Sequence, residues 1–110
     1  MPQPQIPQDS LRAMTSNRTL HVIIRGRVQG VGYRAWTHHQ AQLHGLSGWV
    51  RNRRDGSVEA VFAGPSDLVD VMLKACRQGP RGAVVEAVEE VEASQEASAP
   101  LRTFEVRDTV

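Results

Sequence analysis

The sequence predicts an α+β fold with the element order β-α-β-β-α-β, in which two helices cover one face of an antiparallel sheet. Three observations lead to this class. The chain has 110 residues, enough for one compact core but too few for two ordinary domains. Stretches in which apolar and polar residues alternate are separated by two stretches that are typical of helices. Glycine, proline and aspartate mark the boundaries between them.

The first strand is expected at residues 19–25, where the alternation requires one buried face. That face would carry Leu20, Val22 and Ile24. A glycine-rich turn follows. Residues 34–44 contain no glycine or proline and end before Gly45, which predicts the first helix.

Two β-rich runs follow at residues 46–53 and 57–63. They are separated by Arg54, Asp55 and Gly56, whose chemistry is that of a short hairpin connection. The two runs are therefore expected to pair antiparallel.

The second helix is expected between Ser66 and Gly79, because Gly64 and Pro65 precede it and Pro80 follows it. Its apolar residues recur with helical spacing. They are Leu68, Val71, Met72, Ala75 and Cys76. Cys76 is accordingly interpreted as a small core residue rather than a nucleophile.

The last strands are expected at residues 83–91 and 102–107, the second with Phe104 and Val106 on one face. This order of elements is typical of the ferredoxin-like, split βαβ sandwich. Because that fold hosts many functions, the fold alone names none of them.

Residues 1–17 carry prolines and glutamines without sustained periodicity, so they are expected to be a disordered extension before a single domain at residues 18–110. Translation starting at Met14 is one hypothesis. No apolar run approaches the roughly 18 residues that span a bilayer, and no secretory signal is present. We therefore expect a cytoplasmic monomer that does not bind membranes, and the one cysteine agrees with that location.

Charge is distributed unevenly, although the net charge is only +1. Residues 18–52 contain five arginines and all four histidines but no Asp or Glu, whereas residues 85–96 contain five glutamates and no basic residue. Positive potential around the glycine turn favours an anionic ligand there. A solvated basic face is the alternative.

The glycine turn contains Gly26, Gly30 and Gly32, and their spacing matches neither the Walker nor the dinucleotide motif. Glycines allow positive φ, so that successive N–H groups can converge on an anion at the start of the following helix. Arg34 adds a planar charged fork suited to two phosphate oxygens. The alternative is a purely structural turn.

Asn52 ends a strand that we expect to neighbour the first strand, which would place it beside this turn. Its carboxamide can orient a water but cannot take its proton at neutral pH. From its residue type alone, the favoured interpretation is that Asn52 only begins the turn through Arg53 to Gly56.

Three segments together resemble the acylphosphatase family: GRVQGVGYR at 26–34, GWVRN at 48–52, with eighteen residues from arginine to asparagine, and DGSVEAVFAG at 55–64. The resemblance extends from about Thr19 to Val106. Tyr33 stands where many members carry Phe, which keeps the ring.

By this resemblance Arg34 would bind the phosphate and Asn52 would orient the attacking water. The backbone amides of the loop would complete the phosphate site. That loop comprises Gln29, Gly30, Val31, Gly32, Tyr33 and Arg34. The implied reaction hydrolyses a small acyl phosphate to a carboxylate and orthophosphate, without metal or other cofactor and without a covalent intermediate.

Other interpretations of the sequence are an RNA-binding module, a non-catalytic domain and a metal site. An RNA-binding module shares the element order, but the only aromatic residue of the run 57–63 is Phe62, and strand 19–25 has none; no nucleic-acid partner is therefore expected. A non-catalytic or fused domain that handles one acyl phosphate, such as carbamoyl phosphate, stays open.

His38, His39 and His44 lack the spacing of a helical metal site and are expected on the surface. Trp36 and Trp49 are interpreted as packing residues.

Overall fold

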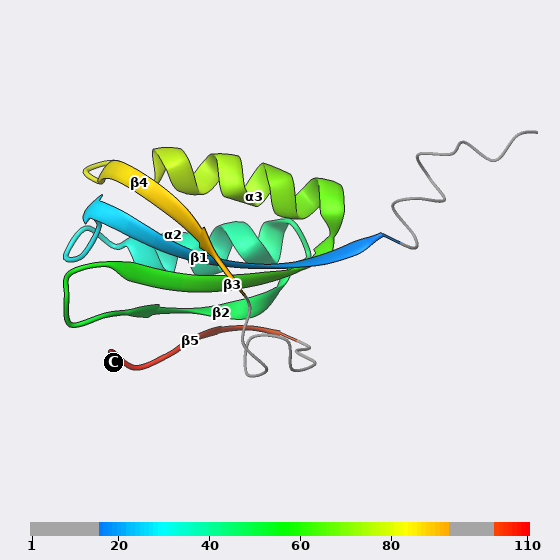
Figure 1. The fold of residues 1–110 in the computed structure, drawn as a ribbon, viewed down its shortest axis with the longest axis horizontal. Coiled ribbons are helices and arrows are strands. Elements are labelled where there is room, and N and C mark those ends of the chain that lie inside the picture. The colour runs from blue at the N-terminus through cyan, green and yellow to red at the C-terminus, as the bar shows by residue number, and fades with distance from the viewer. Residues whose placement is uncertain (1–15, 93–102) are drawn as a thin grey trace, which may run out of the picture.

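The computed structural model describes residues 16–92 and 103–110 and confirms the ferredoxin-like class (Figure 1). Its strands and helices differ from the expected bounds by one to a few residues. In chain order they are β1 (Asn17–Arg27), α2 (Tyr33–Leu43), β2 (Ser47–Asn52), β3 (Val58–Pro65), α3 (Ser66–Gln78), β4 (Val84–Val91) and β5 (Phe104–Val106).

The five strands form one sheet in the order β4-β1-β3-β2-β5. The central pairs are antiparallel, but β5 runs parallel to β2, with Gly48 opposite Phe104. The expectation of an antiparallel sheet was therefore wrong for β5, which lies at the edge opposite β4 and runs parallel to its neighbour β2. The expectation that β2 neighbours β1 was also wrong, since β3 lies between them.

Both helices pack against one face of the sheet, and the core lies between these two layers (Figure 1). In α3 the buried positions are Val69, Met72 and Cys76, whereas Val71 is 44% exposed. The expected apolar stripe was thus misplaced at Val71, because α3 is rotated so that Val69 contacts the core. The largest fully buried side chains of this layer include Tyr33, Phe62, Ile24, Met72, Val22, Val28, Val50, Val58 and Val69.

The opposite face of the sheet is also buried at its centre, so the expectation of one buried face for β1 was incomplete. His21 and Ile23 of β1 are 9% and 5% exposed, and Trp49 of β2 is 1% exposed. The guanidinium groups of Arg51 and Arg107 lie 4.5 and 4.9 Å from the Trp49 ring centre and cover it. Long charged side chains therefore take the place that a second layer of helices would occupy.

The expected extension lies outside the described residues except for its last two positions, and Asn17 already belongs to β1. Within the described ranges, neither helix has the length and apolar character needed to cross a bilayer.

Candidate active site

A pocket of about 340 Å³ lies where the loop after β1, the first turn of α2, the end of β2 and β5 meet. It unites residues that are distant in sequence, including five of the six predicted loop residues and Asn52. The sixth, Val31, is not among the lining side chains and packs against the core. The lining residues are Val28, Gln29, Gly30, Gly32, Tyr33, Arg34, Ala35, Asn52 and Val106.

The loop reaches α2 through two glycines with positive φ, Gly30 at 74° and Gly32 at 80°. Gly32 is the N-cap residue, and no side chain caps the helix. The first helical hydrogen bond runs from the Trp36 N–H to the Gly32 carbonyl at 3.0 Å, so the N–H groups of residues 33–35 precede it. An uncapped helix N-terminus at the wall of a pocket offers these donors and a partial positive charge to an anion.

Tyr33 begins α2, whereas the sequence placed it in the loop before the helix. Its side chain is 2% exposed, and its hydroxyl donates a 2.7 Å hydrogen bond to the carbonyl of Cys76. Pro80 stands four residues after Cys76 and has no N–H to donate to that carbonyl. Tyr33 therefore supplies the missing donor and ties the start of α2 to the end of α3.

Cys76 itself is fully buried in the core, as expected. Burial raises the pKa of its thiol to about 12, which keeps it protonated at neutral pH. Burial likewise raises the pKa of the Tyr33 hydroxyl above its ordinary value. Neither group is poised for chemistry in the pocket.

Asn52 is the last residue of β2, and the C-terminal segment holds its backbone. The Val110 N–H donates to the Asn52 carbonyl at 3.1 Å, and the Arg54 N–H donates to the Val110 carbonyl at 2.8 Å. No role in the site was predicted for this segment or for Val106, which lines the pocket and is 49% exposed. No local pattern in the sequence distinguishes these positions from an ordinary edge strand.

The polar groups of Arg34 and Asn52 are available for a ligand. In residues 16–92 and 103–110, no hydrogen bond or ion pair engages the Arg34 guanidinium or the Asn52 carboxamide. By contrast, Arg25 donates to Glu89 at 2.9 Å, and Arg51 donates to Glu59 at 2.7 Å. No Asp or Glu lines the pocket, so the charge of Arg34 is not neutralised there.

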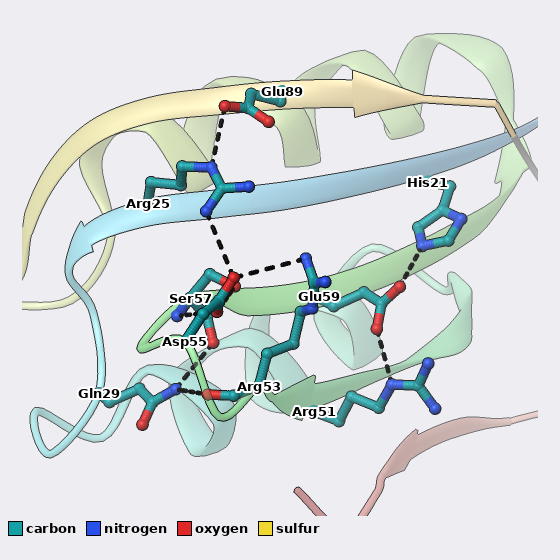
Figure 2. A network of polar contacts seen from close by, with 9 residues as sticks. All are labelled: His21, Arg25, Gln29, Arg51, Arg53, Asp55, Ser57, Glu59 and Glu89. Atoms are coloured by element: carbon teal, nitrogen blue, oxygen red, sulfur yellow. Dashed lines mark hydrogen bonds and ion pairs between the residues drawn. The ribbon is translucent and has the colours of Figure 1, made fainter. Parts of the chain in front are cut away.

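The connection after Asn52 is a tight turn held by Asp55 (Figure 2). One carboxylate oxygen of Asp55 accepts from the Ser57 hydroxyl at 2.5 Å and the Ser57 N–H at 2.9 Å. These two bonds, helped by the nearby charges of Arg53 and Arg25, lower the pKa of Asp55 to about 2. The hairpin is therefore fixed by its own side chains at neutral pH.

A second polar cluster lies on the helix-free face of the sheet (Figure 2). Glu59 lies 2.7 Å from His21 and accepts from Arg51 at 2.7 Å. Burial opposes its charge, but the hydrogen bonds from Arg51 and His21 outweigh burial and lower the pKa of Glu59. The cluster covers the apolar centre of this face, although the His21 Nδ1 atom and the neighbouring Trp49 Nε1 atom are buried there without a hydrogen-bond partner among the described residues.

His39 is exposed, His38 and His44 are half-buried, and no three potential metal ligands gather in the described part of the chain. Phe62 lies in the core, stacked on Phe104 with ring centres 5.6 Å apart. The aromatic considered for RNA binding is therefore not displayed on the open face of the sheet.

Known proteins resemble this chain in sequence along most of its length. The profile of the acylphosphatase family matches residues 20–106. An acylphosphatase of Azorhizobium caulinodans is 64% identical over 72 residues, which are 66% of this chain and 77% of that protein. An acylphosphatase of a Synechococcus strain is 53% identical over 97 residues, which are 88% of this chain and all of that protein.

Solved structures show the same arrangement of helices and strands. The structure of an acylphosphatase from Coxiella burnetii superposes with a TM-score of 0.74 at 31% sequence identity. The match covers 86% of this chain and 97% of that one. With the family profile spanning the loop, Asn52 and β5, the chain belongs to the acylphosphatase family.

Proposed function

We propose that the pocket binds the phosphate of a small acyl phosphate and that a water oriented by Asn52 attacks its phosphorus in line. As a member of the acylphosphatase family, the chain is a hydrolase that acts on acyl phosphates. One observation carries the residue assignment: Arg34 and Asn52 line the same pocket, and both are without a partner in the described part of the chain.

The phosphate would be held by the loop of residues 29–34. Its glycines have positive φ, which allows backbone N–H groups to converge on one anion, and the start of α2 adds three donors that no side chain caps. Arg34 would close the site with two parallel hydrogen bonds to phosphate oxygens. These groups stabilise the charge that spreads over the phosphoryl oxygens in the transition state.

Asn52 would align the water through its side-chain carbonyl oxygen or its NH₂ group. A strong general base is not required, because the leaving group is a carboxylate that departs without a proton. As the new P–O bond forms, the bond between phosphorus and the acyl oxygen breaks and its electron pair leaves with the carboxylate. One proton of the attacking water passes to a phosphoryl oxygen or to solvent, so that the products are a carboxylate and orthophosphate. Positioning and charge stabilisation therefore account for the chemistry, and no step of this proposal uses a metal.

The test measures phosphate release from benzoyl phosphate in the presence of EDTA for wild type, Arg34→Ala and Asn52→Ala. Arg34→Ala should lose about 100-fold or more in kcat/KM and bind inorganic phosphate at least about tenfold more weakly. Asn52→Ala should lose about 100-fold in kcat while its inhibition constant for phosphate stays within about threefold. Arg81→Ala and Asn17→Ala, which change the same residue types at exposed positions outside the pocket, are the matched controls.

Two results would contradict the proposal. Folded wild type without turnover in EDTA would exclude metal-independent hydrolysis. Equal loss of phosphate affinity and turnover in both variants would contradict the separate roles of Arg34 and Asn52. Measuring carbamoyl phosphate beside benzoyl phosphate tests the remaining alternative, a domain dedicated to one acyl phosphate.

A further inference from the structure

We propose that the side chain of Gln29 is a positioning residue that sets the distance between the bound phosphate and the Asn52 side chain. It would do so by joining the phosphate loop to the β2–β3 hairpin. This inference rests on the proposed function of Arg34 and Asn52, and it concerns the Gln29 side chain, whereas the phosphate site proposed above uses backbone amides.

The Gln29 carboxamide donates both of its N–H groups to backbone carbonyls of the β2–β3 hairpin (Figure 2). Its Nε2 atom donates to the carbonyl of Arg53 at 2.7 Å and to the carbonyl of Ser57 at 2.8 Å. Arg53 directly follows Asn52, and Ser57 directly precedes β3. One side chain of the loop is thus hydrogen-bonded to both ends of the turn that connects β2 with β3.

The hairpin does not depend on Gln29 for its own structure. The Arg53 N–H donates to the Ser57 carbonyl at 2.9 Å, and the Gly56 N–H donates to the Arg53 carbonyl at 3.1 Å. Asp55 closes the turn from within. Both carbonyls therefore already have a backbone donor, and the bonds from Gln29 add a link between two segments instead of completing either one.

The order of the sheet explains why such a link matters. The strand before the loop, β1, and the strand that carries Asn52, β2, are separated by β3. Ile24 and Asn52 both pair with Val58 of β3, so loop 28–32 lies beyond the last residues that the β1–β3 and β2–β3 pairings position. On its other side the Asn52 backbone is held by Val110. In the described residues no other side chain of loop 28–32 bonds to the hairpin. A displacement of about 1 Å between reacting groups can cost about 100-fold in rate.

The first test is Gln29→Met, which keeps the length of the side chain and removes its donors, assayed with benzoyl phosphate. We expect kcat to fall at least about tenfold while the inhibition constant of inorganic phosphate stays within about threefold. The phosphate site itself survives, because its amides and Arg34 are unchanged. Gln42→Met, at an exposed position of α2, is the matched control and should behave as wild type.

A double-mutant cycle then separates positioning from general structural support. If Gln29 acts through Asn52, the variant carrying both Gln29→Met and Asn52→Ala should be no more than about twofold slower than Asn52→Ala alone. Gln29→Asn, whose shorter amide cannot reach both carbonyls, provides a second polar variant with the same expected loss in kcat. Urea unfolding of each variant shows that the assayed protein is folded.

Wild-type kcat in folded Gln29→Met and Gln29→Asn would overturn the inference. So would losses that multiply in the double variant, or a rise in the phosphate inhibition constant that matches the loss in kcat. If Asn52→Ala alone keeps wild-type turnover, the proposed function fails first, and the inference fails with it. The single variants thus distinguish the two failures.

Discussion

Replacing Gly48 with alanine should destabilise the protein much more than the same change at Gly56. Both glycines have positive φ, 138° and 93°, and they lie on either side of Asn52. Their surroundings differ. A Cβ atom at Gly48 would lie 1.8 Å from the Val61 carbonyl oxygen and 3.3 Å from the Phe104 ring, whereas a Cβ atom at Gly56 would meet nothing within 4 Å.

The size of the effect follows from these distances. Positive φ costs alanine about 1–2 kcal/mol at either position. At Gly48 the overlap is with backbone, so β2 and β3 would have to separate by about 1 Å or more, since no rotamer change relieves it. Weakening the neighbouring ladder bonds, at about 1 kcal/mol each, brings the expected loss to about 3–5 kcal/mol. That is a large part of the roughly 10 kcal/mol by which domains are ordinarily stable.

The assay is urea unfolding followed by the fluorescence of Trp36 and Trp49, with the slope m checked for two-state behaviour. Gly56→Ala is the control for the shared cost of positive φ. A difference of less than about 1 kcal/mol in unfolding free energy between the two variants would refute the argument, because it would mean that the space around Gly48 adjusts without cost.

Two further predictions concern stability. Tyr33→Phe should lower the free energy of unfolding, measured in urea, by about 1–3 kcal/mol, because it leaves the Cys76 carbonyl without a donor. Its activity should stay within about twofold of wild type. An unchanged free energy of unfolding would contradict the role given to the hydroxyl. Asp55→Asn should be less stable than wild type at neutral pH. Because the pKa of Asp55 is about 2 in the folded protein and 3.8 ordinarily, the difference is present above about pH 4 and lost as pH falls toward 2. A difference that is constant with pH would argue against a lowered pKa.

Local pattern was sufficient for the parts of the fold that depend on neighbours in sequence. The turns around Gly30, Asp55 and Gly79 lie where glycine and aspartate predicted them, because positive φ and side-chain caps are properties of a few adjacent residues. The face of α3 was less predictable. Val71 and Val69 are equally apolar, and only the packing against the sheet decides which of them is buried.

Strand order lay beyond what one sequence could predict. A hairpin brings β2 and β3 together whatever else the sheet does, but nothing in the residues of β2 indicates whether its other edge meets β1 or β5. The short β5 has no apolar alternation long enough to show its partner, so its parallel pairing with β2 was missed. The expectation that Asn52 lies near the loop was nevertheless useful, although the reason given for it was wrong.

Asn52 and the loop meet through contacts that a residue pattern does not encode. Composition identifies which groups suit a phosphate, because guanidinium, glycine amides and an uncapped helix start have that chemistry wherever they occur. The distance between the loop and Asn52 does not follow from composition. It depends on Gln29 reaching the carbonyls of Arg53 and Ser57 and on Val110 pairing with Asn52, across 24 to 58 positions of sequence. Each of these bonds uses an ordinary polar or backbone group, so only the folded chain distinguishes a residue that supplies chemistry from one that sets its geometry.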